Sequence, residues 1–97
     1  MGGHSDEYVV SLKSGQLIYD SLDRGLYDVY KVVILKDEWY FLDEQGQKLP
    51  IHKGDFSVTL SSGQHLKFDV CFNIIHGAPG ENGVLQAYWD AIGQVYT

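Results

Sequence analysis

Hydrophobic positions along the chain follow helical spacing at both ends and extended spacing between them. From Ser5 onward, large side chains recur every three or four residues, which predicts a helix that ends near Leu22. Ser5 can cap that helix, and the acids Asp6 and Glu7 would lie in its first turn, where they complement the helix dipole. The positions expected to face the core are Val9, Leu12, Gln16, Tyr19 and Leu22.

The middle of the chain has the pattern of strands. Residues 27–36 include four consecutive apolar positions, which is typical of a strand covered on both faces, as in a parallel sheet. Two hairpins are expected next, with turns at 43–46 and 61–63. Val70–Ile75 is then the most apolar extended segment and is expected to form a core strand. The hairpin strands are expected at 38–42, 47–51, 56–60 and 65–68.

The last part of the chain predicts a second helix. It begins at Asn82 or Gly83 and ends at Ile92, where Gly93 would stop it, and residues 94–97 read as a short strand. This order of elements predicts an α/β fold, with a Rossmann-like, mostly parallel sheet flanked by helices and interrupted by inserted β-hairpins. The apolar residues available for burial on the second helix are Val84, Leu85, Tyr88, Trp89 and Ile92.

Composition narrows the class of protein. The 97 residues suffice for one domain with a modest core, and 44% hydrophobic with 21% charged residues is ordinary for a globular chain. The apolar runs are too short to span a membrane, no signal peptide opens the chain, and a net charge of −6 with scattered basic residues argues against nucleic acid. The single cysteine, Cys71, is expected to be a buried, inert thiol. We therefore expect a cytoplasmic protein that binds neither membranes nor nucleic acid.

The candidate chemistry lies in a glycine-rich turn between the apolar segment and the second helix. Gly77, Gly80 and Gly83 allow a sharp turn and a close approach to a ligand, and the helix amides would point toward it. Their Gly-x-x-Gly-x-x-Gly spacing is not that of a dinucleotide fingerprint, and Glu81 would repel a pyrophosphate. A turn that binds nothing remains an alternative.

A second glycine turn, at residues 2–7, precedes the first helix. In an α/β sheet both turns would lie beyond the carboxyl ends of neighbouring strands, so Glu7 and His76 are expected to face one crevice. The Glu7 carboxylate there suits a cation such as an amino-acid ammonium. Alternatively, Glu7 only complements the helix dipole and His76 only hydrogen-bonds its own turn. A metal site that adds His4 and Asp6 to these two matches no standard ligand spacing, and we expect none.

The two turns resemble two signatures of the D-alanine–D-alanine ligases. The first is Gly-Gly-x-Ser-x-Glu, followed by Val-Ser-Leu and a pair of small residues. It is similar to residues 2–15. The second, His-Gly-x-x-Gly-Glu-Asp-Gly-x-x-Gln, is similar to residues 76–86, with Asn82 in place of the aspartate. Residues 92–97 resemble the Gly-x-Pro-Tyr strand of the same family, with Gln94 in place of proline. The resemblance spans the whole chain.

The resemblance implies an enzyme that uses ATP and Mg²⁺ (or Mn²⁺) to phosphorylate the carboxylate of one D-alanine. The amine of a second D-alanine then attacks the acyl phosphate, which gives the dipeptide used in peptidoglycan. By this comparison Glu7 is the catalytic residue and meets the ammonium of the first D-alanine, and His76 lies beside the same substrate. Gly80, Glu81 and Gly83 complete the substrate-binding site.

By the same resemblance, residues 1–97 are a single amino-terminal domain of an ATP-grasp ligase, whose ATP-binding domains this chain lacks. The chain alone is expected to be inactive and to bind no cofactor or metal. A non-catalytic amino-acid-binding or assembly module on the same scaffold is the alternative. The family-like layout also places a first strand, missing here, between residues 27–36 and 70–75. Either these strands close up, or a second copy supplies strand edges; we expect the second arrangement, a homodimer.

Overall fold

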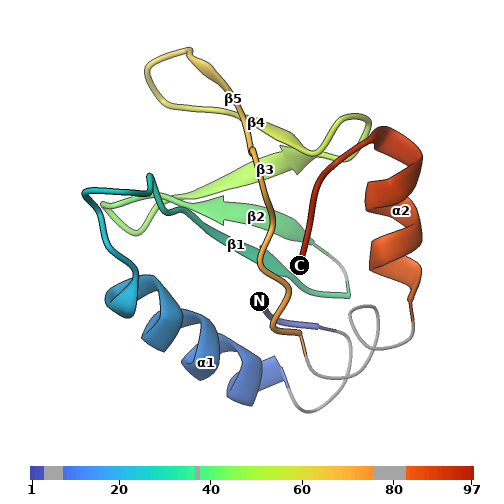
Figure 1. Cartoon of the computed structure of the whole chain (residues 1–97). Coiled ribbons are helices and arrows are strands. Elements are labelled where there is room, and N and C mark those ends of the chain that lie inside the picture. Colours follow the sequence, from blue (N-terminus) through green and yellow to red (C-terminus); the bar gives the residue numbers. More distant parts are fainter. Residues whose placement is uncertain (4–7, 37, 76–82) are drawn as a thin grey trace.

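The computed structural model of the chain describes residues 1–3, 8–36, 38–75 and 83–97. In these ranges the α/β fold and both hairpins expected from the sequence are confirmed (Figure 1). The elements are α1 (Tyr8–Ser21), β1 (Lys31–Ile34), β2 (Trp39–Leu42), β3 (Lys48–His52), β4 (Ser57–Thr59), β5 (His65–Lys67) and α2 (Val84–Ile92).

The five strands form one sheet in the order β1-β2-β3-β4-β5, and each pairs with its neighbours in antiparallel orientation. The expected mostly parallel sheet is therefore not confirmed. Short connections join these successive strands, whereas parallel neighbours need long crossovers. Among the described residues, parallel pairing is limited to two isolated bridges, Gly2–Ile34 and Cys71–Tyr96. The expected strands at 70–75 and 94–97 share the second of these bridges and form no longer ladder with each other.

Helix α2 covers one face of the sheet with its apolar side. Leu85 and Trp89 are 1% and 3% exposed, and the Trp89 ring meets that of Phe56 edge-on at a centroid distance of 5.6 Å. Val84 was also expected to be buried but is exposed. Gly93 ends the helix in the left-handed conformation, as predicted. The sheet and loop residues in this core are Ile34, Phe41, Ile51, Phe56, Val58 and Ile75.

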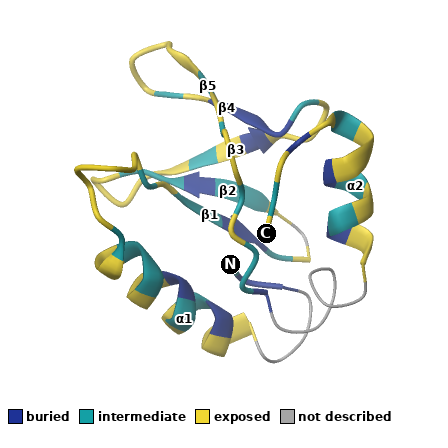
Figure 2. Ribbon diagram, viewed as in Figure 1, coloured by how far each residue is buried: buried dark blue, intermediate teal, exposed yellow. Residues whose placement is uncertain are grey.

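Helix α1 packs through small residues and not through the expected stripe. Its buried residues are Ser11 and Gly15, whereas Val9 and Gln16, which were expected to face the core, are exposed (Figure 2). The remaining members of the stripe are half-buried: Leu12, Tyr19 and Leu22. The prediction of the helix was correct, and the prediction of its buried face was wrong at two of five positions.

Gly15 explains why this face is buried. A Cβ at position 15 would lie 2.9 Å from Met1 Cβ and 3.0 Å from Ile74 Cδ1, closer than ordinary carbon contacts. Only a residue without a side chain lets α1 approach the start of the chain and the end of the 70–75 segment this closely. Hydrophobic periodicity, which weighs large side chains, does not detect such a contact.

Residues 1–3 pair with the edge of β1 that faces away from β2. This is the edge where the family-like layout places the missing first strand. The Met1 ammonium donates to the Val32 carbonyl at 2.9 Å, and the Ile34 amide donates to the Met1 carbonyl at 2.7 Å. The Gly3 amide donates to the Ile34 carbonyl, which completes a short parallel ladder. The structure thus shows a third arrangement, in which the chain's own first residues enter the gap. The expected homodimer is not tested by a single chain and stays a prediction.

The Ser11 hydroxyl joins this short ladder to the neighbouring segment. It accepts a hydrogen bond from the Gly2 amide at 2.8 Å and donates one to the Ile74 carbonyl at 2.8 Å. Gly2 has φ 105°, and a Cβ there would lie 2.5 Å from the Ile34 carbonyl oxygen, so glycine is required. Ser11 is 0% exposed, which means that water cannot replace these hydrogen bonds.

Replacing Ser11 with alanine should destabilise the domain. The change leaves the Gly2 amide and the Ile74 carbonyl buried without a partner, and we expect a loss of about 2–4 kcal/mol in the free energy of unfolding. Urea denaturation measures this loss. The control is Ser21→Ala, because the exposed Ser21 hydroxyl only donates to Leu17 of its own helix; its cost should stay below about 0.5 kcal/mol. Equal stability of the two variants would contradict the bridging role of Ser11.

The Met1 amino group predicts a pH dependence of stability. Burial lowers the pKa of this group from 8.0 to about 6, and the nearby Cys71 opposes the shift. Because the unfolded chain binds this proton more tightly, the neutral amino group contributes fully to the free energy of unfolding above pH 8. This contribution is lost as the pH falls to 6. The difference is on the order of 2–3 kcal/mol. Urea denaturation at several pH values should show this slope in the free chain and not in a chain acetylated at Met1. Identical slopes would show that the amino group is solvated.

Candidate functional site

Most of the expected site residues lie outside the part of the chain that the structure describes. This holds for Glu7, His76, Gly80 and Glu81, and also for His4 and Asp6, which were weighed as metal ligands. Their placement in one crevice therefore stays a prediction. The described residues show where the two turns start and where the second one ends.

The two turns start from neighbouring positions. Ser11 hydrogen-bonds both Gly2, the first residue of the turn at 2–7, and Ile74, which lies just before the second signature at 76–86, although these residues are far apart in the sequence. Gly3 and Ile75 are buried, so both chain segments leave from inside the domain. This arrangement supports the expectation that the side chains of both turns share one end of the sheet.

Gly83 is the described member of the expected site. It is the N-cap of α2, with φ 82° and ψ −4°, and as a glycine it has no side chain to make a capping hydrogen bond. No atom lies within 4 Å of a Cβ placed there, so the backbone conformation requires glycine and crowding does not. Since α2 begins at Val84, the positive end of its dipole lies directly after the glycine turn in the chain. This position is suited to a polar or anionic group.

Other titratable side chains in the described ranges do not add a reactive centre. No group of three or more histidine, cysteine or acidic residues there is placed to hold a metal ion. His52 and His65 are exposed on the sheet, and His65 lies 3.5 Å from the Asp55 carboxylate. Burial raises the pKa of the half-buried Cys71 to about 12, so its thiol is not a nucleophile at neutral pH. In the same ranges, no helix has the length and apolar character needed to cross a membrane.

Sequence comparison identifies the family of this domain. The family described as D-ala D-ala ligase N-terminus matches residues 1–97. The chain is 52% identical over 97 residues to the D-alanine–D-alanine ligase of Flavobacterium psychrophilum and 47% identical over 93 residues to that of Christiangramia forsetii. These matches cover 100% and 96% of this chain but only 29% and 28% of the two relatives.

Solved structures show the same fold. The D-alanine–D-alanine ligase from Coxiella burnetii matches 98% of this chain and 33% of its own with a TM-score of 0.84 and 25% identity. D-alanyl-alanine synthetase A from Vibrio cholerae matches 99% of this chain and 28% of its own with a TM-score of 0.79 and 28% identity. The fold therefore defines one α/β domain of a larger type of protein. The chain belongs to the D-alanine–D-alanine ligase family, of which it represents the amino-terminal domain.

Substitutions at Gly83 separate its backbone role from a role in packing. Gly83→Ala should cost about 1–2 kcal/mol, because alanine is strained in the left-handed conformation. Gly83→Asn should cost less, since asparagine tolerates that conformation. Gly54→Ala is the matched control, because Gly54 also has open space around its Cβ position but no positive φ. Thermal or urea unfolding measures all three variants, and an equal effect at positions 83 and 54 would contradict the requirement for glycine at the N-cap.

Proposed function

We propose that this chain is the substrate-binding amino-terminal part of an enzyme that joins two D-alanines with ATP. The match of the whole chain to the ligase amino-terminal domain carries the proposal. The two hydrogen bonds of Ser11 support it, because they bring the starts of both signature turns together. The product dipeptide would serve peptidoglycan synthesis in the cytoplasm.

Glu7 is proposed as the residue that holds the ammonium of the first D-alanine. A carboxylate and an ammonium form a charge-assisted hydrogen bond, which is stronger and more directional than a neutral one. His76 would lie beside the same substrate, and Gly80, Glu81 and Gly83 would shape its pocket. The N-cap position of Gly83 supports this assignment, because the chain there turns directly into α2.

ATP and its metal ion are proposed for the parent enzyme and not for this chain. Mg²⁺ is bound by several oxygen ligands, usually carboxylates and phosphates, and the described residues offer no such cluster. We therefore assign no phosphoryl-transfer step to them. The chain spans less than a third of the length of the relatives named above. On its own it should not hydrolyse ATP in response to D-alanine.

The alternative is a non-catalytic module that binds an amino acid or assists assembly on the same scaffold. The full-length parent distinguishes the two functions when it is incubated with D-alanine, ATP and Mg²⁺. Release of phosphate together with the dipeptide supports the ligase. Turnover only with another amino acid would change the substrate and keep the reaction type, and the absence of any turnover would favour the module.

Glu7→Gln in the parent should damage turnover more than folding. Loss of the ammonium contact should cost about 1.5–3 kcal/mol, equivalent to a fall of roughly 10- to 150-fold in kcat/KM. The fold should lose at most about 1 kcal/mol, from the weaker helix-dipole interaction. Glu44→Gln, in the exposed turn between β2 and β3, is the control and should change neither quantity. Equal losses of activity and melting stability in Glu7→Gln would contradict the substrate role.

A further inference from the structure

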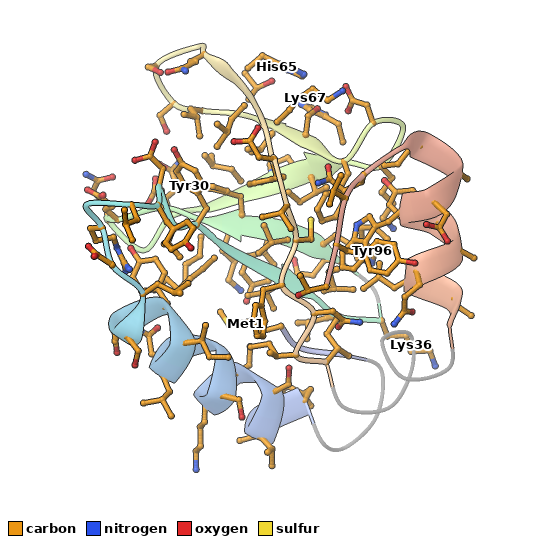
Figure 3. The ribbon with its side chains drawn as sticks, viewed as in Figure 1. Met1, Tyr30, Lys36, His65, Lys67 and Tyr96 are labelled. Carbon is orange, nitrogen blue, oxygen red and sulfur yellow. The ribbon has the colours of Figure 1, made fainter. Side chains whose placement is uncertain are left out.

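Both ends of the first glycine turn are attached to segments that Ser11 holds together. The Gly2 amide, in the first residue of the turn at 2–7, donates to the Ser11 hydroxyl at 2.8 Å. Met1, the residue before Gly2, lies between α1 and β1 (Figure 3). Tyr8, which follows the turn, is the first residue of α1, and Ser11 lies in the first helical turn. The start and the end of this glycine turn are therefore linked through one side chain.

The same hydroxyl fixes the segment from which the second glycine turn starts. Ser11 donates to the Ile74 carbonyl at 2.8 Å. The Asn73 side-chain oxygen accepts a hydrogen bond from the Ile75 amide at 3.1 Å, which restrains the backbone on both sides of Ile74. The direction in which the chain enters the second turn is thus set relative to α1.

Covalent geometry limits how far the two proposed substrate residues can lie from these fixed points. Glu7 directly precedes Tyr8 in the chain, so their Cα atoms are about 3.8 Å apart across a trans peptide bond. His76 follows Ile74 by two residues, which limits the separation of their Cα atoms to about 7.6 Å. The route from Glu7 to His76 through the described structure therefore consists of the first turn of α1, one hydrogen bond of Ser11 and two residues of chain.

We propose that Ser11 is a positioning residue for the first D-alanine. Its hydroxyl sets the distance between the segments that carry Glu7 and His76, and it does so without touching the substrate. This inference rests on the proposed function, in which Glu7 holds the substrate ammonium. The strength of such a hydrogen bond depends steeply on its geometry. In active sites, a displacement of about 1 Å can slow the reaction by up to about 100-fold.

Removal of the Ser11 hydroxyl should move the two turns apart. Ser11 is 0% exposed, so water does not reach the hydroxyl in the folded chain. A water molecule occupies about 30 Å³ in the liquid, which is more than one deleted hydroxyl group leaves free. Water can therefore replace the hydroxyl between Gly2 and Ile74 only if α1 moves away from them. Such a movement changes the position of Glu7 relative to His76.

Kinetics of the full-length parent enzyme test the proposal. At saturating ATP and at a temperature where the variant is folded, Ser11→Ala should lower kcat/KM for D-alanine about tenfold. The KM for ATP should stay within about twofold, because ATP is assigned to the rest of the parent. Ser11→Cys keeps the size of the side chain and a weaker hydrogen-bonding group, so it should recover part of the loss. It also carries the same comparisons if Ser11→Ala does not fold.

Val58→Ala is the matched control for lost stability. Val58 is also 0% exposed, and it belongs to the apolar core that includes Leu85 and Trp89 of α2. Urea denaturation measures how closely the stabilities of the two alanine variants agree. Because Val58 contacts neither turn through a hydrogen bond, its replacement should change kcat/KM by less than about twofold.

Gly15→Ala displaces α1 without removing the hydroxyl. A Cβ at position 15 would lie 3.0 Å from Ile74 Cδ1, so the added methyl group should push the helix away from Ile74. This variant should lower kcat/KM for D-alanine in the same direction as Ser11→Ala. An unchanged kcat/KM in a folded Gly15→Ala enzyme would contradict the dependence of the site on the position of α1.

A double-mutant cycle with Glu7→Gln distinguishes positioning from general destabilisation. If Ser11 acts through Glu7, the variant with both substitutions should keep kcat/KM within about twofold of Glu7→Gln alone. The proposal is overturned if the two losses multiply, or if Ser11→Ala loses no more activity than Val58→Ala. These outcomes require an active parent. Failure of the unsubstituted parent to turn over D-alanine would instead overturn the proposed function, and this inference with it.

Discussion

The Ser11 hydroxyl makes two 2.8 Å hydrogen bonds to backbone groups that are distant in sequence, the Gly2 amide and the Ile74 carbonyl. Gly2 is the first residue of one glycine-rich turn of the family signatures, and Ile74 lies just before the other. Because Ser11 is fully buried, these bonds cannot be exchanged for water without a cost. The position of the first turn relative to the second therefore depends on one side chain of α1. The shape of any crevice between the two turns would depend on this contact in the same way.

Small residues make the contact possible. Gly15 lets α1 approach Met1 and Ile74, and Gly2 adopts a positive φ against Ile34 where a side chain would collide with the backbone. Helix α2 is different, since its Leu85 and Trp89 belong to a conventional apolar core. The α2 contacts thus supply hydrophobic stabilisation, and the α1 contacts position the start of the chain. A deletion of apolar volume should affect the α2 contacts most, and an added methyl group the α1 contacts.

The elements that local signals determine were predictable from the sequence. The β2–β3 hairpin is an example, because the Asp43 carboxylate accepts hydrogen bonds from the Gln45 and Gln47 amides and so fixes the turn within five residues. The helix face was not predictable from hydrophobic spacing, because Gly15 and Ser11 contribute by small size and hydrogen bonding. The segment 70–75 is as apolar as a core strand, but a strand also needs a partner. The described residues give it only the bridge from Cys71 to Tyr96. The residues of the candidate site came from the family resemblance. The structure adds that the two turns start from neighbouring positions.

The central claim is that residues 1–3 are held as part of the sheet by β1 and by Ser11. Hydrogen exchange of the Gly2 and Gly3 amides in the unliganded chain tests it most directly, because each donates one of the hydrogen bonds involved. We expect both amides to be protected to an extent similar to that of Val33, whose amide faces β2 in the sheet. Exchange of Gly2 and Gly3 at the rate of an unstructured peptide, with Val33 still protected, would contradict the claim.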